Sequence, residues 1–167
     1  MDVLAALEHS AFSTWIRESP SVWAYGFVLF LHTVGLAMLV GPSLVVDLRV
    51  LGVAAELPLP DFAPFFRLAW WGFALNAASG VVLFAADATM KAVNPVFYAK
   101  LALIAAGMWL LTRIRLALGR DAGPPRWLAA ASLVVWSSAI VAGRLLAYFG
   151  QDSGLEDLLK RALGLGA

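Results

Sequence analysis

The feature that most constrains the fold is an apolar run from Val22 to Val46 that contains no acidic residue, lysine or arginine. A helix rises about 1.5 Å per residue, so about 20 apolar residues cross a hydrocarbon core that is about 30 Å thick. The run can therefore span a membrane as one helix. His32 lies about 15 Å from its start, near the bilayer midplane. An ionisable side chain there is unfavourable unless a partner binds it.

Three further apolar segments follow this run, each long enough to span. Unpaired backbone groups are unfavourable in lipid, so all four segments are expected to be helices. Prolines and short polar connections separate them, which favours an antiparallel, up-down arrangement. The sequence therefore predicts an all-α fold: one integral membrane domain over 1–167, with a four-helix bundle whose spans cover about 22–46, 68–86, 95–111 and 127–149.

Both ends of the chain show the pattern of short amphipathic helices. Over 2–18, apolar residues recur on one side of a helix that ends before Pro20. Over 154–164, leucines recur at i, i+3 and i+4 after a capping-box pair, Ser153 and Glu156. We expect these helices to lie along the membrane surface or to pack on the bundle or a partner, because amphipathicity alone does not distinguish these cases.

The composition excludes several classes of function. The chain is 62% hydrophobic and 14% charged, far from the average of soluble domains. It has no cysteine, which excludes disulfides, thiolate metal sites and cysteine nucleophiles. A net charge of +1 without a basic run argues against nucleic-acid binding. No serine, histidine and acid share a catalytic spacing, so the sequence favours a non-enzymatic role over an enzymatic one.

The basic residues in the connections predict an orientation. The side after the first and third spans carries Arg49, Arg67, Arg113, Arg115, Arg120 and Arg126, and the other side carries Arg17, Lys91, Lys160 and Arg161. Cytoplasmic loops are enriched in lysine and arginine. We therefore expect both termini on the outer, periplasmic side of a bacterial inner membrane.

Helical spacing predicts which faces of the spans meet inside the bundle. Each predicted face carries small or polar residues, as interior surfaces of membrane bundles do. The four faces are Tyr25, His32, Gly35 and Leu39; Phe73, Asn76, Gly80 and Asp87; Lys100, Ile104, Gly107 and Leu111; and Ser137, Val141, Arg144 and Tyr148.

These faces predict a polar pocket in two layers. Lys100 and Arg144 form a basic layer below the outer surface, near Asp87, and His32 and Asn76 form a neutral layer beneath it. Each residue also has a purely structural interpretation. Lys100 and Arg144 can snorkel to the headgroups, Arg144 can pair with Asp87, and His32 and Asn76 can be hydrogen-bonded core residues.

A resemblance rests on three strings: LHTVGLAMLVGPSLVVDLRVLG, NPVFYAKLAL and SLVVWSSAIVAGRLLAYF. Together they resemble an uncharacterised bacterial family of small four-helix membrane proteins, over about Trp15 to Phe149. The positions that carry it are His32, Gly35, Gly41, Asp47, Arg49, Gly52, Gly80, Asn94, Pro95, Lys100, Gly143 and Arg144. The resemblance implies the four-helix fold and no established activity. In general appearance the family is similar to CopD-type and b-type cytochrome membrane proteins, which usually carry more than one intramembrane histidine.

Three classes of function fit the predicted pocket. The first is a prosthetic group or small ligand, either haem b, with His32 as axial ligand and the propionates on Lys100 and Arg144, or a quinone bonded to His32 and Asn76. The second is a small transporter or channel, because buried ionisable groups mark ion paths. The third is a non-catalytic subunit or scaffold. The expected partners are membrane lipids and a homo-oligomer or larger membrane complex.

Overall fold

The computed structural model describes residues 2–58, 62–118 and 123–149, and within these ranges the chain is helical without any strand. This confirms the predicted all-α class. The helices are α1 (Asp2–Glu8), α2 (Ala11–Glu18), α3 (Tyr25–Leu51), α4 (Ala63–Ala86), α5 (Ala88–Val93), α6 (Pro95–Ala117) and α7 (Arg126–Phe149).

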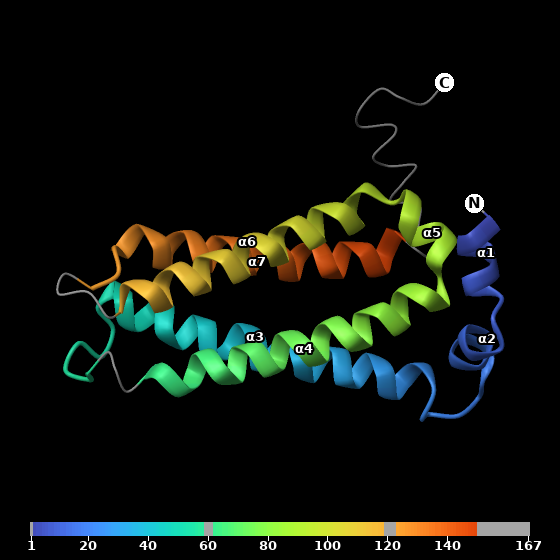
Figure 1. Ribbon diagram of the computed structural model, residues 1–167, viewed down its shortest axis with the longest axis horizontal. Helices are drawn as coiled ribbons and strands as arrows, with labels where there is room; N and C mark the ends of the chain where they lie inside the picture. Colours follow the sequence, from blue (N-terminus) through green and yellow to red (C-terminus); the bar gives the residue numbers. More distant parts are fainter. Residues whose placement is uncertain (1, 59–61, 119–122, 150–167) are drawn as a thin grey trace, which may run out of the picture.

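Helices α3, α4, α6 and α7 form an up-down membrane bundle (Figure 1). All four are long and apolar enough to cross a bilayer, the shortest apolar stretch being the 21 residues from Arg126 to Leu146 of α7. At 1.5 Å per residue, 21 residues extend about 32 Å, which matches the hydrocarbon core. The chain is therefore an integral membrane protein of the predicted architecture.

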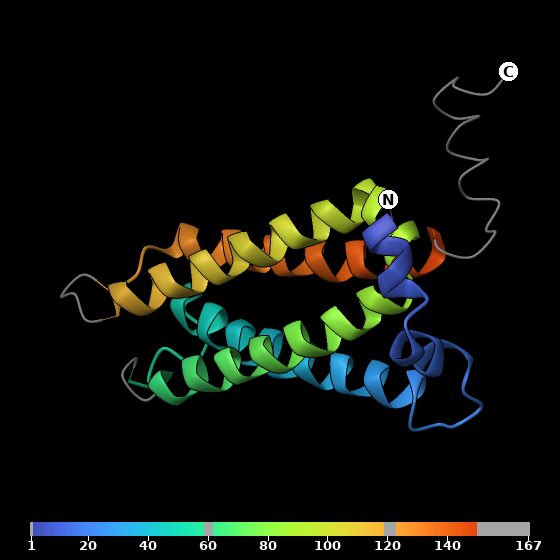
Figure 2. The same cartoon turned by 45° about the vertical axis from the view of Figure 1, so that its right-hand side comes forward.

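The bundle consists of two hairpins. Helix α3 packs along α4, and α6 packs along α7, as Figures 1 and 2 show. The hairpins are joined mainly through α3 and α7, whereas α4 and α6 scarcely touch. This asymmetry leaves room between α4 and α6.

Two glycines explain why α3 and α4 pack so closely. A Cβ atom built on Gly35 would lie 2.6 Å from the backbone nitrogen of Asn76, and one on Gly72 would lie 2.5 Å from the backbone nitrogen of Leu39. Neither position can hold a side chain without separating the helices. Small residues that allow such backbone approach are the usual basis of helix association in lipid.

Helix α3 begins and ends later than the apolar run. It continues past Asp47 to Leu51, where Gly52 takes a left-handed φ of 110° and its N–H donates to the carbonyl of Arg49. Val53 N–H donates to the carbonyl of Leu48, which completes a glycine-type C-terminal cap. The sequence placed the end of the span at the first charge, but the charge of Asp47 does not terminate the helix.

The N-terminal segment forms two helices rather than the single helix predicted over 2–18. Ser10 caps α2 by accepting a hydrogen bond from the Ser13 N–H, which breaks the helix between α1 and α2. Short helix α5, between α4 and α6, was not predicted. The helix predicted over 154–164 lies outside the described residues.

Helices α1 and α2 dock against the end of the bundle where α4 meets α5 (Figure 2). The Glu8 carboxylate accepts hydrogen bonds from the Thr89 N–H (2.9 Å) and hydroxyl (2.6 Å). Arg17 donates to the carbonyl of Ala86 (2.9 Å) and lies 3.7 Å from Glu8. The N-terminal segment therefore packs on the bundle, which was one of the predicted alternatives, although Phe12 and Trp15 remain exposed.

Candidate functional site

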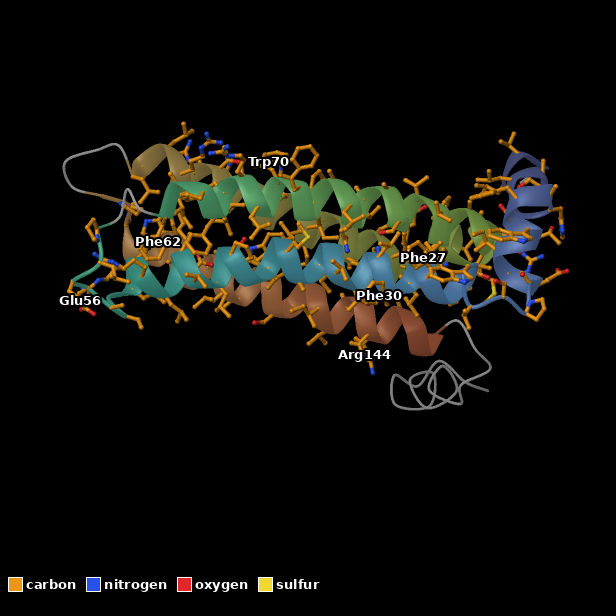
Figure 3. All side chains as sticks on the ribbon, turned by 90° about the horizontal axis from the view of Figure 1, so that it is seen from below. Phe27, Phe30, Glu56, Phe62, Trp70 and Arg144 are labelled. Atoms are coloured by element: carbon orange, nitrogen blue, oxygen red, sulfur yellow. The ribbon has the colours of Figure 1, made fainter. Side chains whose placement is uncertain are left out.

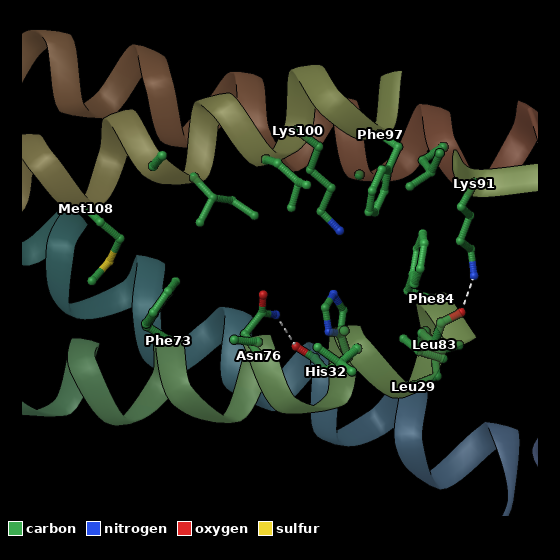
Figure 4. Close-up of a pocket in the computed structure, with 18 of the residues that line it drawn as sticks. Leu29, His32, Phe73, Asn76, Leu83, Phe84, Lys91, Phe97, Lys100 and Met108 are labelled. Carbon is green, nitrogen blue, oxygen red and sulfur yellow. Dashed lines mark hydrogen bonds between the residues drawn. The ribbon is translucent and has the colours of Figure 1, made fainter. Parts of the chain in front are cut away.

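A cavity of about 480 Å³ lies where the two hairpins separate. Ligand sites typically enclose 300–1,000 Å³, so its size suits a small organic molecule. The walls are mostly apolar, with a few polar groups (Figure 4). The residues that line it are Tyr25, Leu29, His32, Phe73, Asn76, Ala77, Gly80, Val81, Leu83, Phe84, Lys91, Phe97, Lys100, Leu101, Ile104, Ala105, Met108, Gly143 and Leu146.

His32 of α3 is held in a fixed orientation at the cavity wall. Its Nδ1 lies 3.1 Å from the Ser79 hydroxyl oxygen, and that hydroxyl is 2.7 Å from the carbonyl of Leu75, to which it donates. The single hydroxyl proton is thereby used, so Ser79 accepts from His32 and the imidazole proton is on Nδ1. Nε2 then carries a lone pair and has no partner among the described residues. Gly80 makes room for the ring, because a Cβ there would lie 3.3 Å from Cε1.

Asn76 of α4 is buried beside His32 and connects the two helices. Its side-chain amide donates to the backbone carbonyl of His32 at 2.8 Å. Figure 4 shows the amide oxygen on the other side, pointing into the cavity. Asn76 therefore serves both roles considered for it: it holds the helices together and presents an acceptor to the cavity.

Lys100 of α6 reaches into the cavity from the opposite wall, toward His32 (Figure 4). Its amine passes beside Gly143 of α7, where a built Cβ would lie 3.7 Å from Nζ. Within the described ranges, Lys100 forms no hydrogen bond or ion pair. A lysine amine that faces the interior of a membrane bundle without a partner is costly, and such residues mark functional sites.

The cavity opens sideways between α4 and α6. Helices α4 and α6 scarcely touch there, and two lining residues on each helix are exposed: Ala77 and Val81 on α4, and Leu101 and Ala105 on α6. This part of the surface faces the acyl chains in a membrane. A lipid-soluble molecule can therefore reach the cavity without crossing the aqueous phase.

The end of the cavity near α5 is closed by side chains. Phe84 of α4 and Phe97 of α6 stack with ring centroids 5.2 Å apart. Beside them, the Lys91 ammonium lies 2.8 Å from the Asp87 carboxylate and also donates to the carbonyl of Leu83. The charge of Lys91 is therefore balanced, in contrast to that of Lys100.

Arg144 does not join the other three predicted site residues. Its side chain is exposed on the outer side of α7, pointing away from the remaining helices (Figure 3), and it does not line the cavity. The predicted interior face of α7 is wrong for the same reason, because Ser137 and Val141 are exposed as well. Ser132, Trp136 and Ala139 form the buried face instead. The basic layer therefore contains Lys100 without Arg144, and Asp87 pairs with Lys91.

Several cavity residues were not predicted as part of the site. Lys91 was assigned to a connection, because its position depends on the unpredicted helix α5. Met108 and Phe97, both in the third predicted span, were not part of the predicted pocket. Met108 lines the cavity at the end far from His32 (Figure 4). Helical spacing could have predicted this wall of the cavity, because steps of four, three and four residues place Phe97, Leu101, Ile104 and Met108 on one face of α6.

The donor set is suited to an organic head group rather than to a metal ion held by protein alone. No cluster of three or more histidine, cysteine or acidic residues occurs among the residues that the structure describes. The polar side chains that line the cavity are Tyr25, His32, Asn76, Lys91 and Lys100. Of these, His32 presents an imidazole lone pair, Asn76 an amide oxygen and Lys100 an amine, whereas the Lys91 ammonium pairs with Asp87. Comparison with family models, with curated proteins and with solved structures found no match for this chain. The resemblance described above stays a prediction.

Proposed function

We propose that the protein binds a membrane-soluble quinone or its quinol in the cavity between α4 and α6. The observation that carries this proposal is the arrangement of His32 Nε2 and the Lys100 amine, which face one another across an apolar cavity without partners. A quinone has an apolar body and carbonyl oxygens, and Lys100 can donate to a carbonyl. A quinol has hydroxyl groups, which can donate to His32 Nε2 and to the Asn76 amide oxygen. Lys100 therefore serves the quinone, and His32 and Asn76 serve the quinol.

The sideways opening supports a ligand of this class. A quinone with an isoprenoid tail resides in the hydrocarbon core, so its head can enter between Val81 and Leu101 while the tail stays in lipid. A water-soluble ligand has no need of an opening toward acyl chains. The cavity volume of about 480 Å³ accommodates a head group and the first part of a tail.

The test is mass spectrometry of lipids that remain bound after purification in mild detergent. We expect wild-type protein to retain a quinone at a defined ratio and Lys100→Met to lose it by about 10-fold or more, since a hydrogen bond to a charged group contributes about 1.5–3 kcal/mol. Arg144→Met is the matched control, because it removes a cation at similar depth outside the cavity. Equal retention in both variants would contradict the proposal.

A b-type haem is a second candidate, favoured by one observation. The Nδ1–H of His32 is fixed by Ser79, which leaves Nε2 directed into the cavity, as in histidines that ligate a metal through one nitrogen while the other is held. The outward position of Arg144 removes one of the two expected propionate partners. A visible spectrum of the purified protein distinguishes the candidates: a Soret band that His32→Ala abolishes supports haem, and a colourless, iron-free preparation excludes it.

For the orientation, we propose that the end of the bundle with Arg49, Arg67 and Arg126 faces the cytoplasm of a bacterial inner membrane. Both described ends of the chain, at α1 and α7, then lie on the periplasmic side (Figure 1). Cysteine accessibility in intact cells tests this: a cysteine at Val3 should react with an impermeant reagent, and one at Ala55 should not.

A further inference from the structure

A second polar group lies inside the bundle, separate from the cavity. Asp47 of α3 is 0% exposed, and neither of its carboxyl oxygens has a hydrogen-bond partner in the part of the chain that the structure describes. It does not line the cavity. On the same helix, Asp47 lies 15 residues from His32, about 22 Å along the axis. The proposed ligand therefore does not explain this residue.

The helix that faces Asp47 presents two further unpaired polar groups. Ser132 of α7 is 0% exposed, and its hydroxyl lies close to the Asp47 carboxyl, although the pair lacks hydrogen-bond geometry. Trp136, one turn along α7, is also buried, and its indole N–H is unpaired. The ring of Trp136 is fixed against Gly107 of α6, where a built Cβ would lie 2.7 Å away. The Asp47 carboxyl thus lies close to an unpaired hydroxyl of α7, that of Ser132.

No positive charge neutralises Asp47 within the described ranges. Arg49, on the same helix, donates to the carbonyls of Leu57 (2.7 Å) and Ala55 (2.8 Å) in the following loop. The other described charged residues at this end of the bundle are exposed on their own helices or in the loop: Glu56, Arg67 on α4, Arg113 and Arg115 on α6, and Arg126 on α7. None of them forms an ion pair with Asp47.

We propose that Asp47 is a proton-binding site, in which the carboxyl group is held as the neutral acid between α3 and α7. An ionised carboxylate that is removed from water is strongly unfavourable without a counter-ion, and two neutral donors cannot cancel its charge. Addition of one proton to one carboxylate oxygen removes the charge. The acid O–H then donates to the Ser132 oxygen. This gives the Asp47 carboxyl and the Ser132 hydroxyl a hydrogen-bond partner, which both lack among the described residues.

The site lies at the main junction between the hairpins, because α3 and α7 provide most of the contact between them. The bound proton therefore stabilises the end of the bundle opposite the cavity's closed end. The proposal is independent of the cavity ligand, so failure of one leaves the other intact.

Infrared spectroscopy of the purified protein tests the proposal, because a protonated carboxylic acid has a carbonyl stretch that carboxylates lack. We expect this band in wild type at neutral pH, its loss in Asp47→Asn, and its retention in Asp87→Asn, whose carboxylate pairs with Lys91. We expect Ser132→Ala to keep the band at a changed frequency and Ser137→Ala, on the exposed face, to leave it unchanged. Absence of the band in wild type, or its presence in Asp47→Asn, overturns the proposal.

Thermal unfolding supplies the second measurement. Asn is a neutral isostere of the acid, so Asp47→Asn should fold with a Tm close to that of wild type. A large fall in Tm would mean that the ionised form is required, which contradicts a bound proton. A metal cation is the competing occupant: a wild-type Tm that rises with sodium at constant pH and ionic strength, and does not rise in Asp47→Asn, would also overturn the proposal.

Discussion

Helix α4 meets its two neighbours in opposite ways. Along α3 the backbones approach so closely that Gly35 and Gly72 have no room for a Cβ atom, and the polar groups of Asn76 and Ser79 are paired across or along the interface. Toward α6 there is little contact, and the groups that face this space, His32 Nε2 and the Lys100 amine, are unpaired. The α3–α4 interface therefore positions the site, and the α4–α6 interface leaves it open to a ligand.

The largest expected effect comes from breaking the close interface. Gly72→Ala places a Cβ 2.5 Å from backbone nitrogen of α3, so we expect a loss of about 1–3 kcal/mol of stability or more, as in other overpacked interiors. Gly41→Ala is the matched control, since nothing lies within 4 Å of its built Cβ. The control should stabilise α3 by about 0.5–1 kcal/mol. Unfolding in detergent measures both, and equal effects would show that the interface is not constrained by glycine.

Filling the open interface should have the next largest effect, on ligand binding rather than stability. Ala105 lines the cavity and is exposed at its opening, so Ala105→Trp should block entry and lower quinone retention by about 10-fold or more. Ala102→Trp is the control, because Ala102 is exposed on α6 but does not line the cavity. A ligand retained equally by the two tryptophan variants would mean that it binds elsewhere.

Loss of the hydrogen bond that orients the His32 ring should weaken ligand binding more modestly. Ser79→Ala removes the acceptor that fixes the His32 Nδ1–H, and a neutral hydrogen bond contributes about 0.5–1.5 kcal/mol, or about 2- to 10-fold in affinity. Ser43→Ala is the matched control. The Ser43 hydroxyl also donates to a carbonyl of its own helix, that of Leu39 at 2.8 Å, but Ser43 lies outside the cavity. Titration with the quinol, whose hydroxyl donates to His32 Nε2, should separate the two variants. An unchanged affinity in Ser79→Ala would show that the ring orientation is unimportant.

The smallest effect concerns the docking of α1 on α5, away from both interfaces. Hydrogen bonds from the Thr89 side chain and backbone lower the pKa of Glu8 from its ordinary value of 4.5. A lowered pKa in the folded state stabilises docking above pH 4.5, and this contribution is lost as the pH falls through the lowered value. Protection of the α1 amides, measured relative to their intrinsic exchange rates at each pH, should therefore fall several-fold on acidification. Glu8→Gln should show no such acid dependence, and a matching dependence in that variant would assign the effect to another group.

The sequence was sufficient to predict the spans, because charge is excluded from lipid over the length of a helix. It also predicted three interior faces, including those of His32, Asn76 and Lys100, because ionisable and small residues turn inward. It failed for Arg144, because in lipid the outer face of α7 is as apolar as its interior, and serine and valine occur on both. It missed α5 and therefore Lys91, since six residues are too few for a periodic signal.

A photoreactive quinone analogue tests the claim that a quinone head lies between His32 and Lys100. After illumination in native membranes and digestion, we expect cross-linked peptides from the cavity walls, around Val81 on α4 and Leu101 on α6. Excess unlabelled quinone should suppress these cross-links, and Lys100→Met should reduce them. Cross-links confined to the exposed outer face of α7, around Val141 and Arg144, or insensitive to competition, would contradict the claim.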